Sequence, residues 1–234
     1  MCTMVVYYLD PNYTEEVLNK INYGLVCEKI IEESDRGDVR PSLLLHVCCA
    51  PCSSYVIEYL ERHFDLTLYF YNPNITDTAE FAHRLDELYS FIDKREGKNY
   101  QIIIPEYRPE EFFEAVKGYE DIPEGGMRCY ICYELRLRKT ALAAKALGFD
   151  YFTTTLSVSP YKNAAVLCET GDKLATELGI KYLPSDFKKK GGYLRSIELS
   201  SIYELYRQDY CGCCFSQSEA KARKLLNSRE NNDR

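Results

Sequence analysis

The stretch Leu43-Leu44-Leu45-His46-Val47-Cys48-Cys49-Ala50-Pro51-Cys52 decides the fold of this chain. A continuous apolar run bounded by Pro41 and Pro51 is typical of a strand that is buried on both faces of a parallel sheet. The residues from Ser53 to His63 that follow favour a helix. The segment therefore predicts a strand over 43–48 that leads directly into a helix, with three cysteines at the junction.

The same alternation of strand and helix continues on both sides of this segment. Further strands are predicted at 66–71, 102–105, 151–156 and 180–183. Helices are predicted at 14–33, from Asp77 to about 92, from Pro109 to about 116, up to a stop at Gly148, and at 164–178. Such alternation indicates βαβ units, and we expect an α/β fold with a doubly wound, Rossmann-like parallel sheet and a helical C-terminal part.

We expect three regions along the 234 residues. Residues 1–40 form an N-terminal helical extension with Thr14 as its helix cap, 41–227 form one α/β catalytic domain, and 228–234 form a frayed polar tail.

The composition is that of a globular protein, with 46% apolar and 28% charged residues. No secretion signal or bilayer-spanning run is recognisable, so a soluble, cytoplasmic protein without a membrane partner is expected. The net charge of −7 excludes a global basic field, and any RNA would need a local basic patch.

Cysteine is unusually frequent, with eleven residues in the chain. In a reducing compartment this frequency favours metal binding or redox chemistry over structural disulfides. Eight of the cysteines lie in three tight groups: Cys48, Cys49 and Cys52; Cys129 and Cys132; and Cys211, Cys213 and Cys214.

The first two groups can together supply a metal site. Thiolates at a strand end that precedes a helix are stabilised by the helix dipole and by backbone N–H groups. The Cys129-x-x-Cys132 doublet has the spacing of zinc and iron–sulfur ligands, although a redox dithiol remains open. Four thiolates fit zinc or an iron–sulfur cluster. Their place at the ligand-binding edge of the sheet favours the cluster.

The third group, Cys211-Gly212-Cys213, places two thiols one residue apart around a permissive glycine. A disulfide in so small a loop would be strained and easily reduced, as catalytic disulfides are. Extra metal ligands or a buried core pair are the alternatives.

The isolated cysteines and the histidines are expected to have structural roles. The residues concerned are Cys2, Cys27, Cys168, the strand residue His46 and the helix-surface residues His63 and His83.

Five motifs, in order from about Leu43 to Ser216, resemble the QueH family of cobalamin-independent epoxyqueuosine reductases. They are Leu45–Cys52, Tyr71-Asn72-Pro73-Asn74, Arg128–Arg136, Phe152–Asn163, and Phe187–Lys190 through Tyr210–Cys213. The family fold is similar to the adenine-nucleotide hydrolase-like sheet. The resemblance implies reductive deoxygenation of epoxyqueuosine at the tRNA wobble position, the last step of queuosine biosynthesis, with an electron donor that the sequence does not identify.

The resemblance also implies roles for individual cysteines. Cys48, Cys49, Cys129 and Cys132 would hold a 4Fe–4S cluster, and Cys211 and Cys213 would form a redox-active disulfide. A second, mononuclear iron is associated with the family. Relatives can have Asp where this chain has Cys52, and we expect Cys52 or an adjacent iron to polarise the epoxide oxygen.

Candidate RNA contacts are basic, aromatic or polar residues near the motifs. They are Asn72, Arg128, Arg136, Arg138, Lys139, Tyr161, Lys162, Lys188, Lys189, Lys190, Tyr193 and Arg195. Neutralising the lysine run is expected to weaken tRNA binding and its dependence on salt. The alternatives are a zinc-binding RNA-interaction module and an ATP-dependent tRNA-modifying enzyme of the same fold class. The ATP-dependent enzyme would need a glycine-rich phosphate loop where the first cysteine group stands.

Overall fold

A five-stranded sheet forms the centre of the protein, and all of its strands are parallel. The computed structural model describes residues 21–95 and 97–232, with side chains as far as residue 228. The strand order is β3-β2-β1-β4-β5. The strands are β1 (Ser42–His46), β2 (Asp65–Tyr69), β3 (Gln101–Ile103), β4 (Tyr151–Thr154) and β5 (Lys181–Tyr182).

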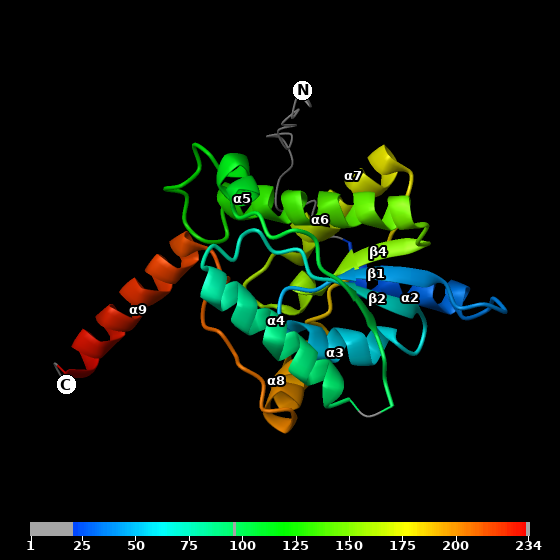
Figure 1. Cartoon of the computed structure of the whole chain (residues 1–234), viewed down its shortest axis with the longest axis horizontal. Coiled ribbons are helices and arrows are strands. Elements are labelled where there is room, and N and C mark those ends of the chain that lie inside the picture. Colours follow the sequence, from blue (N-terminus) through cyan, green and yellow to red (C-terminus); the bar gives the residue numbers. More distant parts are fainter. Residues whose placement is uncertain (1–20, 96, 233–234) are drawn as a thin grey trace.

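Helices cover both faces of this sheet, which confirms the predicted α/β class (Figure 1). They are α2 (Tyr23–Ser34), α3 (Ala50–Leu60), α4 (Thr78–Asp93), α5 (Glu110–Ala115), α6 (Met127–Leu147), α7 (Ala164–Leu178), α8 (Gly192–Ile202) and α9 (Cys214–Asn232), with a 3₁₀ turn at Thr155–Val158. Helices α6 and α7 pack together on one face, and α3, α4 and α8 lie on the other. Helix α9 projects away from the body.

Local sequence signals set several helix ends where they were predicted. The Asp77 carboxylate accepts a hydrogen bond from the Ala79 N–H at 2.8 Å and caps α4. Gly148 ends α6 in the left-handed conformation, with φ of 79°. Helix α7 begins at Ala164 and ends at Leu178 as expected, with Asn163 as its N-cap.

The junction after β1 differs from the prediction. The strand ends at His46 rather than at Cys48, and α3 begins at Ala50 rather than at Ser53. Pro51 lies in the first turn of the helix, where its missing N–H costs nothing. The vicinal cysteines therefore occupy the short turn between the two elements, and Cys49 is the N-cap residue of α3.

The ends of the chain lie partly outside the described residues. The predicted cap Thr14 and the isolated Cys2 belong to the part that is not described. Helix α2 begins at Tyr23, and the Asn22 side chain caps it. At the other end, α9 continues to Asn232. No helix in the described part of the chain is long and apolar enough to cross a bilayer.

Alternate residues of β1 pack into two separate cores. Leu43 and Leu45 belong to the core beneath α3 and α4, whereas Leu44 belongs to the core beneath α6 and α7. The buried His46 donates or accepts through both ring nitrogens, with Thr154 Oγ1 at 2.8 Å and the Tyr71 carbonyl at 3.1 Å. Burial and the nearby Arg136 lower the pKa of His46 to about 3, so it is a neutral structural residue.

The strand order places a topological switch point beside β1. The chain first moves outward from β1 to β2 and β3, and then crosses back to β4 on the other side. Loops that leave the carboxyl ends of β1 and β4 therefore separate in opposite directions and leave a crevice, which is where α/β sheets bind ligands.

Candidate active site

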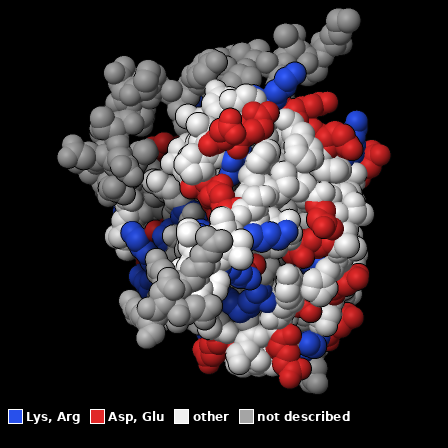
Figure 2. Space-filling model, turned by 90° about the vertical axis from the view of Figure 1, so that its left-hand side faces the viewer, with Lys and Arg blue, Asp and Glu red and all other residues white. Residues whose placement is uncertain are grey.

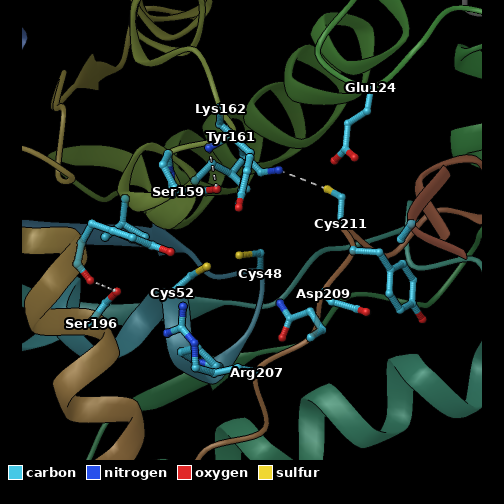
Figure 3. A pocket seen from close by; sticks show the side chains of 18 of the residues that line it. Cys48, Cys52, Glu124, Ser159, Tyr161, Lys162, Ser196, Arg207, Asp209 and Cys211 are labelled. Carbon is cyan, nitrogen blue, oxygen red and sulfur yellow. Dashed lines mark hydrogen bonds between the residues drawn. The ribbon is translucent and has the colours of Figure 1, made fainter. Parts of the chain in front are cut away.

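A cavity of about 580 Å³ opens at this edge of the sheet. The turn after β1, the loop after β4 and the segment before α9 all contribute to its walls (Figure 3). Figure 3 shows Cys48 and Cys52 side by side at its centre, with Lys162 reaching from the opposite wall toward Cys211. Two of the three cysteine groups found in the sequence thus face one hollow.

The first cysteine group is compact. The sulfur atoms of Cys48, Cys49 and Cys52 all lie within 4.8 Å of one another, and the Cys48 and Cys49 sulfurs are 3.7 Å apart. In the described residues these three form the one group of metal-ligating side chains with such spacing. Cys48 and Cys49 lie in the turn just before α3, and Cys52 lies in its first turn, so the backbone dipole of α3 favours negative charge on them.

The three thiols of this group share their negative charge unequally. Hydrogen bonds from Cys49 and Cys52 hold the pKa of Cys48 well below its ordinary value. The same contact with Cys48 raises the pKa of Cys49 to about 12, and contacts with both neighbours raise the pKa of Cys52 well above normal. Cys48 is therefore the thiol of this group on which negative charge is most favoured, and a bound metal would favour the ionised form of the other two.

The second group lies at the start of α6 and is not part of the first. The Cys129 sulfur accepts the Gly125 N–H at 3.3 Å, and Cys132 is buried one turn further on. Burial raises the pKa of Cys132 to about 12, although Arg136 opposes this. Cys132 packs in the same apolar cluster as Cys213, so the second and third cysteine groups meet there.

The sulfur atoms of Cys211 and Cys213 in the third group have different surroundings. Cys211 lines the cavity, and its sulfur accepts a hydrogen bond from Lys162 Nζ at 3.2 Å. Cys213 is buried and accepts the Ser216 N–H at 3.4 Å. Between them Gly212 has φ of 124°, a conformation that L-residues rarely adopt. Both are free thiols.

Cys211 is held in a cationic environment. Burial alone would raise its pKa, but the Lys162 ammonium and the Arg136 guanidinium lower the pKa of Cys211 below its ordinary value. The pKa of Cys213, by contrast, is raised by burial and by the charge of Cys211. Cys211 is thus the more nucleophilic thiol of the pair.

Arg84 anchors the cysteine loop, although the sequence motifs did not identify this residue. From α4 its Nη1 donates to the Cys211 carbonyl at 3.0 Å, and its Nε donates to Glu80 at 2.7 Å. Arg84 is only 2% exposed. Its place on the apolar stripe of α4, three residues after Phe81 and four before Leu88, is a signal that could have revealed it.

Most of the predicted RNA-contact residues are paired with protein groups. Lys188 and Lys189 contact Asp186 at 2.9 and 3.7 Å, and Lys190 pairs with Glu28. Arg195 pairs with Glu58 and Glu198, Arg138 with Glu134 and Glu177, and Lys139 with Glu111.

Four further predicted RNA-contact residues have different surroundings. Arg128 of α6 is buried, and its Nη2 atom forms an ion pair with Oε1 of Glu219 in α9 at 2.9 Å. Asn72 is buried and donates to the Val47 carbonyl. Tyr161 is 78% exposed at the cavity, which Tyr193 also lines.

The walls of the cavity are positively charged in an otherwise acidic protein. Six basic side chains and two carboxylates line it. Besides Arg84, sequence reasoning missed three of these basic residues, Arg207, Arg223 and Lys224, because they become neighbours only when α9 folds beside the cysteine loop. Figure 2 shows one face of the molecule in space-filling form. Lys and Arg gather in the lower left of that face, and Asp and Glu lie mainly along its upper and right-hand margins.

Comparison with known proteins points to one family. The sequence profile described as "Epoxyqueuosine reductase QueH" matches residues 43–219. The chain belongs to the QueH family. The matched range contains all three cysteine groups and all five motifs of the sequence analysis, so the resemblance stated there is confirmed.

Relatives from several bacteria support this assignment, and each is named epoxyqueuosine reductase QueH. The relative from Streptococcus pyogenes is 44% identical over 200 residues, which cover 84% of this chain and 78% of the relative. That from Staphylococcus aureus is 43% identical over 212 residues and 88% of both chains. That from Thermotoga maritima is 35% identical over 193 residues, or 81% of this chain and 97% of the relative.

Proposed function

We propose that this protein reduces epoxyqueuosine to queuosine in the wobble position of tRNA, with thiols of the cavity as reductant and ligands. The observation that carries the proposal is the meeting of Cys48, Cys52 and Cys211 around one cationic cavity. Membership of the QueH family supplies the substrate. A cavity of about 580 Å³ is within the size range of small-molecule sites and leaves room for a nucleoside.

The electron balance of the reaction suits a dithiol. Removing the oxygen of an epoxide leaves an alkene and water, and it consumes two electrons and two protons. Oxidation of Cys211 and Cys213 to a disulfide releases two electrons and two protons, so one dithiol balances one turnover. An external reductant then restores the thiols. The Lys162 contact keeps Cys211 reactive toward that exchange.

The cysteines fit the iron–sulfur centre that family membership implies. Thiolates are the ligands that such clusters require, and Cys48, Cys49, Cys129 and Cys132 are the four proposed to hold a 4Fe–4S cluster. The buried positive charge of Arg136 beside them suits an anionic centre. When bound, the cluster supplies electrons one at a time. Cys52 faces the same cavity and is a candidate ligand for the mononuclear iron associated with the family.

The protein groups around the cavity have separate tasks in this proposal. Cys52 would face the epoxide oxygen and polarise it; the same residue would hold a second iron, which would supply a Lewis acid at this place. Tyr161 stacks on a base of the anticodon loop, because aromatic faces bind unstacked bases in single-stranded RNA. The cysteine turn occupies the place where an ATP-dependent enzyme would carry its phosphate loop, which disfavours that alternative.

The proposal is tested with tRNA from a strain that lacks the reductase. The anaerobically prepared protein should contain iron and acid-labile sulfide and convert epoxyqueuosine to queuosine in nucleoside digests. Cys211→Ser and Cys213→Ser should each lower multiple turnover by at least about 100-fold, because the disulfide cannot form. The matched control is Cys214→Ser in the same segment, which should retain activity. A zinc-only protein, or full turnover by both serine variants, would refute the proposal.

A further inference from the structure

Arg136 is a buried cation whose hydrogen-bonding groups are mostly unused. It lies on α6 one turn after Cys132, lines the cavity and is only 1% exposed. Its Nη1 donates to Asn74 Oδ1 at 3.0 Å and to Asn72 Oδ1 at 3.4 Å. Its Nε and Nη2 are buried and have no hydrogen-bond partner among the described residues.

This arrangement is costly unless a further group is present. A buried charge without a counter-ion destabilises a protein, and each buried donor left unpaired destabilises it further. No carboxylate in the described part of the chain forms an ion pair with Arg136. The neighbours whose negative charge acts on it are instead three thiols, those of Cys132, Cys211 and Cys48, and the Tyr133 phenol.

The position of the guanidinium is fixed by the turn that follows β2. Asn72 is itself held by its bond to the Val47 carbonyl at 2.9 Å, and Asn74 receives the other Nη1 contact. Among the described residues, the guanidinium is therefore held in place through its Nη1 atom only. Its Nε and Nη2 remain unpaired there, and the residues whose charges act on Arg136 include Cys48 and Cys132, one from each pair of proposed ligands.

Lys162 does not serve the same purpose, because its ammonium already contacts the Cys211 sulfur at 3.2 Å. The two cations thus have separate partners. Lys162 serves the dithiol, and Arg136 has donors that no protein group of the described chain takes up.

We infer that Arg136 is the positioning cation of the iron–sulfur centre, and that its Nε and Nη2 hydrogens bond to sulfur of the bound cluster. The inference rests on the proposed function, since it requires a cluster at Cys48, Cys49, Cys129 and Cys132. A cluster held by four thiolates carries net negative charge in both oxidation states. An adjacent cation and N–H donors stabilise the reduced state more strongly, and so raise the reduction potential.

A second consequence concerns the stability of the apoprotein, that is, the protein before the cluster binds; the protein with its cluster is called the loaded protein. In the apoprotein the buried Arg136 has no carboxylate partner among the described residues and its Nε and Nη2 donors are unused, so an apolar replacement of similar length should not destabilise it. In the loaded protein the same replacement removes the counter-charge of the cluster. The two states should therefore respond to the substitution in opposite directions, which an ordinary structural arginine would not produce.

The test uses the full chain with Arg136→Met, Arg136→Lys and, as a control on the same helix, Arg138→Met. Each protein is reconstituted anaerobically and assayed for iron and sulfide, for midpoint potential by EPR-monitored titration, and for thermal unfolding with and without the cluster. Arg136→Met should unfold at the same or a higher temperature as apoprotein. Its gain in unfolding temperature on loading should be smaller than that of the wild type, and its midpoint potential more negative.

The lysine and control variants separate charge from packing. Arg136→Lys retains the charge and should keep a midpoint potential closer to that of the wild type than Arg136→Met does. Arg138→Met should match the wild type in cluster content and potential. If Arg136→Met loads normally with an unchanged potential, or if it destabilises apoprotein and loaded protein equally, the inference is wrong.

If Arg136→Met does not fold, Arg136→Lys alone decides. A potential identical to that of the wild type would then contradict a role for the N–H donors, whereas a displaced potential would support it. Wild-type protein without iron and sulfide would instead refute the proposed function, and Arg136 would lose its partner with it.

Discussion

The contact between Lys162 and Cys211 distinguishes two thiols that look equivalent in the sequence. The ammonium lies 3.2 Å from the Cys211 sulfur, whereas the Cys213 sulfur is hydrogen-bonded by the uncharged groups of Ser216. Because a nearby cation stabilises the thiolate, Cys211 should react first with an electrophile.

Replacing Lys162 by Met should therefore raise the pKa of Cys211. We expect the pH of half-maximal alkylation to rise by about one to two pH units, and alkylation near neutral pH to slow by roughly 10-fold. The measurement is the rate of iodoacetamide labelling of the Cys211 peptide in apoprotein, followed by mass spectrometry. Lys181→Met on β5 is the control and should leave the profile unchanged. An unaltered profile in Lys162→Met would show that the contact has no electrostatic effect.

At the level of residues, the sequence predicted chemistry better than contacts. The cysteine groups could be found from spacing alone, and the family resemblance assigned them roles. The anchors Arg84 and Arg136 were either missed or interpreted as RNA contacts. Their partners are loop carbonyls and amides far away in the sequence, and such contacts exist only after the sheet has formed.

Helix α8 illustrates how one position controls the packing of an element. Gly192 is its first residue, and a Cβ there would lie 2.0 Å from the Phe187 carbonyl oxygen and 2.4 Å from the Tyr55 ring. The glycine permits α8 to lie against α3, so that Tyr193 and Ser196 can line the cavity.

Gly192→Ala should consequently lower the free energy of unfolding by about 1–3 kcal/mol, because backbone must move to admit the methyl group. Urea denaturation of the apoprotein measures this. Gly37→Ala is the control, since its Cβ would meet nothing closer than 3.4 Å and should change stability by no more than roughly 0.5 kcal/mol. If the two variants had the same free energy of unfolding, α8 would accommodate the added methyl group without loss of stability.

The elements themselves were largely predictable, with errors at their ends. Asp77, Asn163 and Gly148 act through neighbours within a few residues, so the ends of α4, α6 and α7 follow from local chemistry. The end of β1 does not, because Val47 still donates to the Tyr69 carbonyl while the chain is already turning. Strand ends depend on the partner strand, which hydropathy does not reveal.

At the scale of the whole molecule, a net charge of −7 coexists with a cationic cavity. The lysine run suggested by the sequence does not line this cavity and pairs with Asp186 and Glu28. At the rim of the cavity, Lys224 pairs with Asp209 and Arg223 lies 3.9 Å from Glu124. Arg207 donates to the Ser200 hydroxyl. We expect an anionic loop to enter over the rim formed by Arg207, Arg223 and Lys224, because these residues line the cavity.

Replacing these three rim residues by Gln should weaken tRNA binding at low salt. The slope of log affinity against log salt should become shallower by about 0.7 to 2, the values for one to three phosphate contacts on single-stranded RNA. A triple Gln variant of Lys188, Lys189 and Lys190 should change the slope less, because these lysines do not line the cavity. Filter binding across a salt series compares the two. A larger effect of the lysine run would place the RNA there instead.

The position of β1 at the middle of the sheet has a consequence for how the protein is made. Ribosomes release the vicinal cysteines first, the doublet later, and the Cys211–Cys213 loop after both. Both edges of β1 are covered only once β4 has paired with it, so the cavity still lacks the Cys211–Cys213 wall when the four proposed cluster ligands have already been synthesised. We therefore expect that iron for the proposed cluster could enter an open site during synthesis, before the Cys211–Cys213 segment closes it.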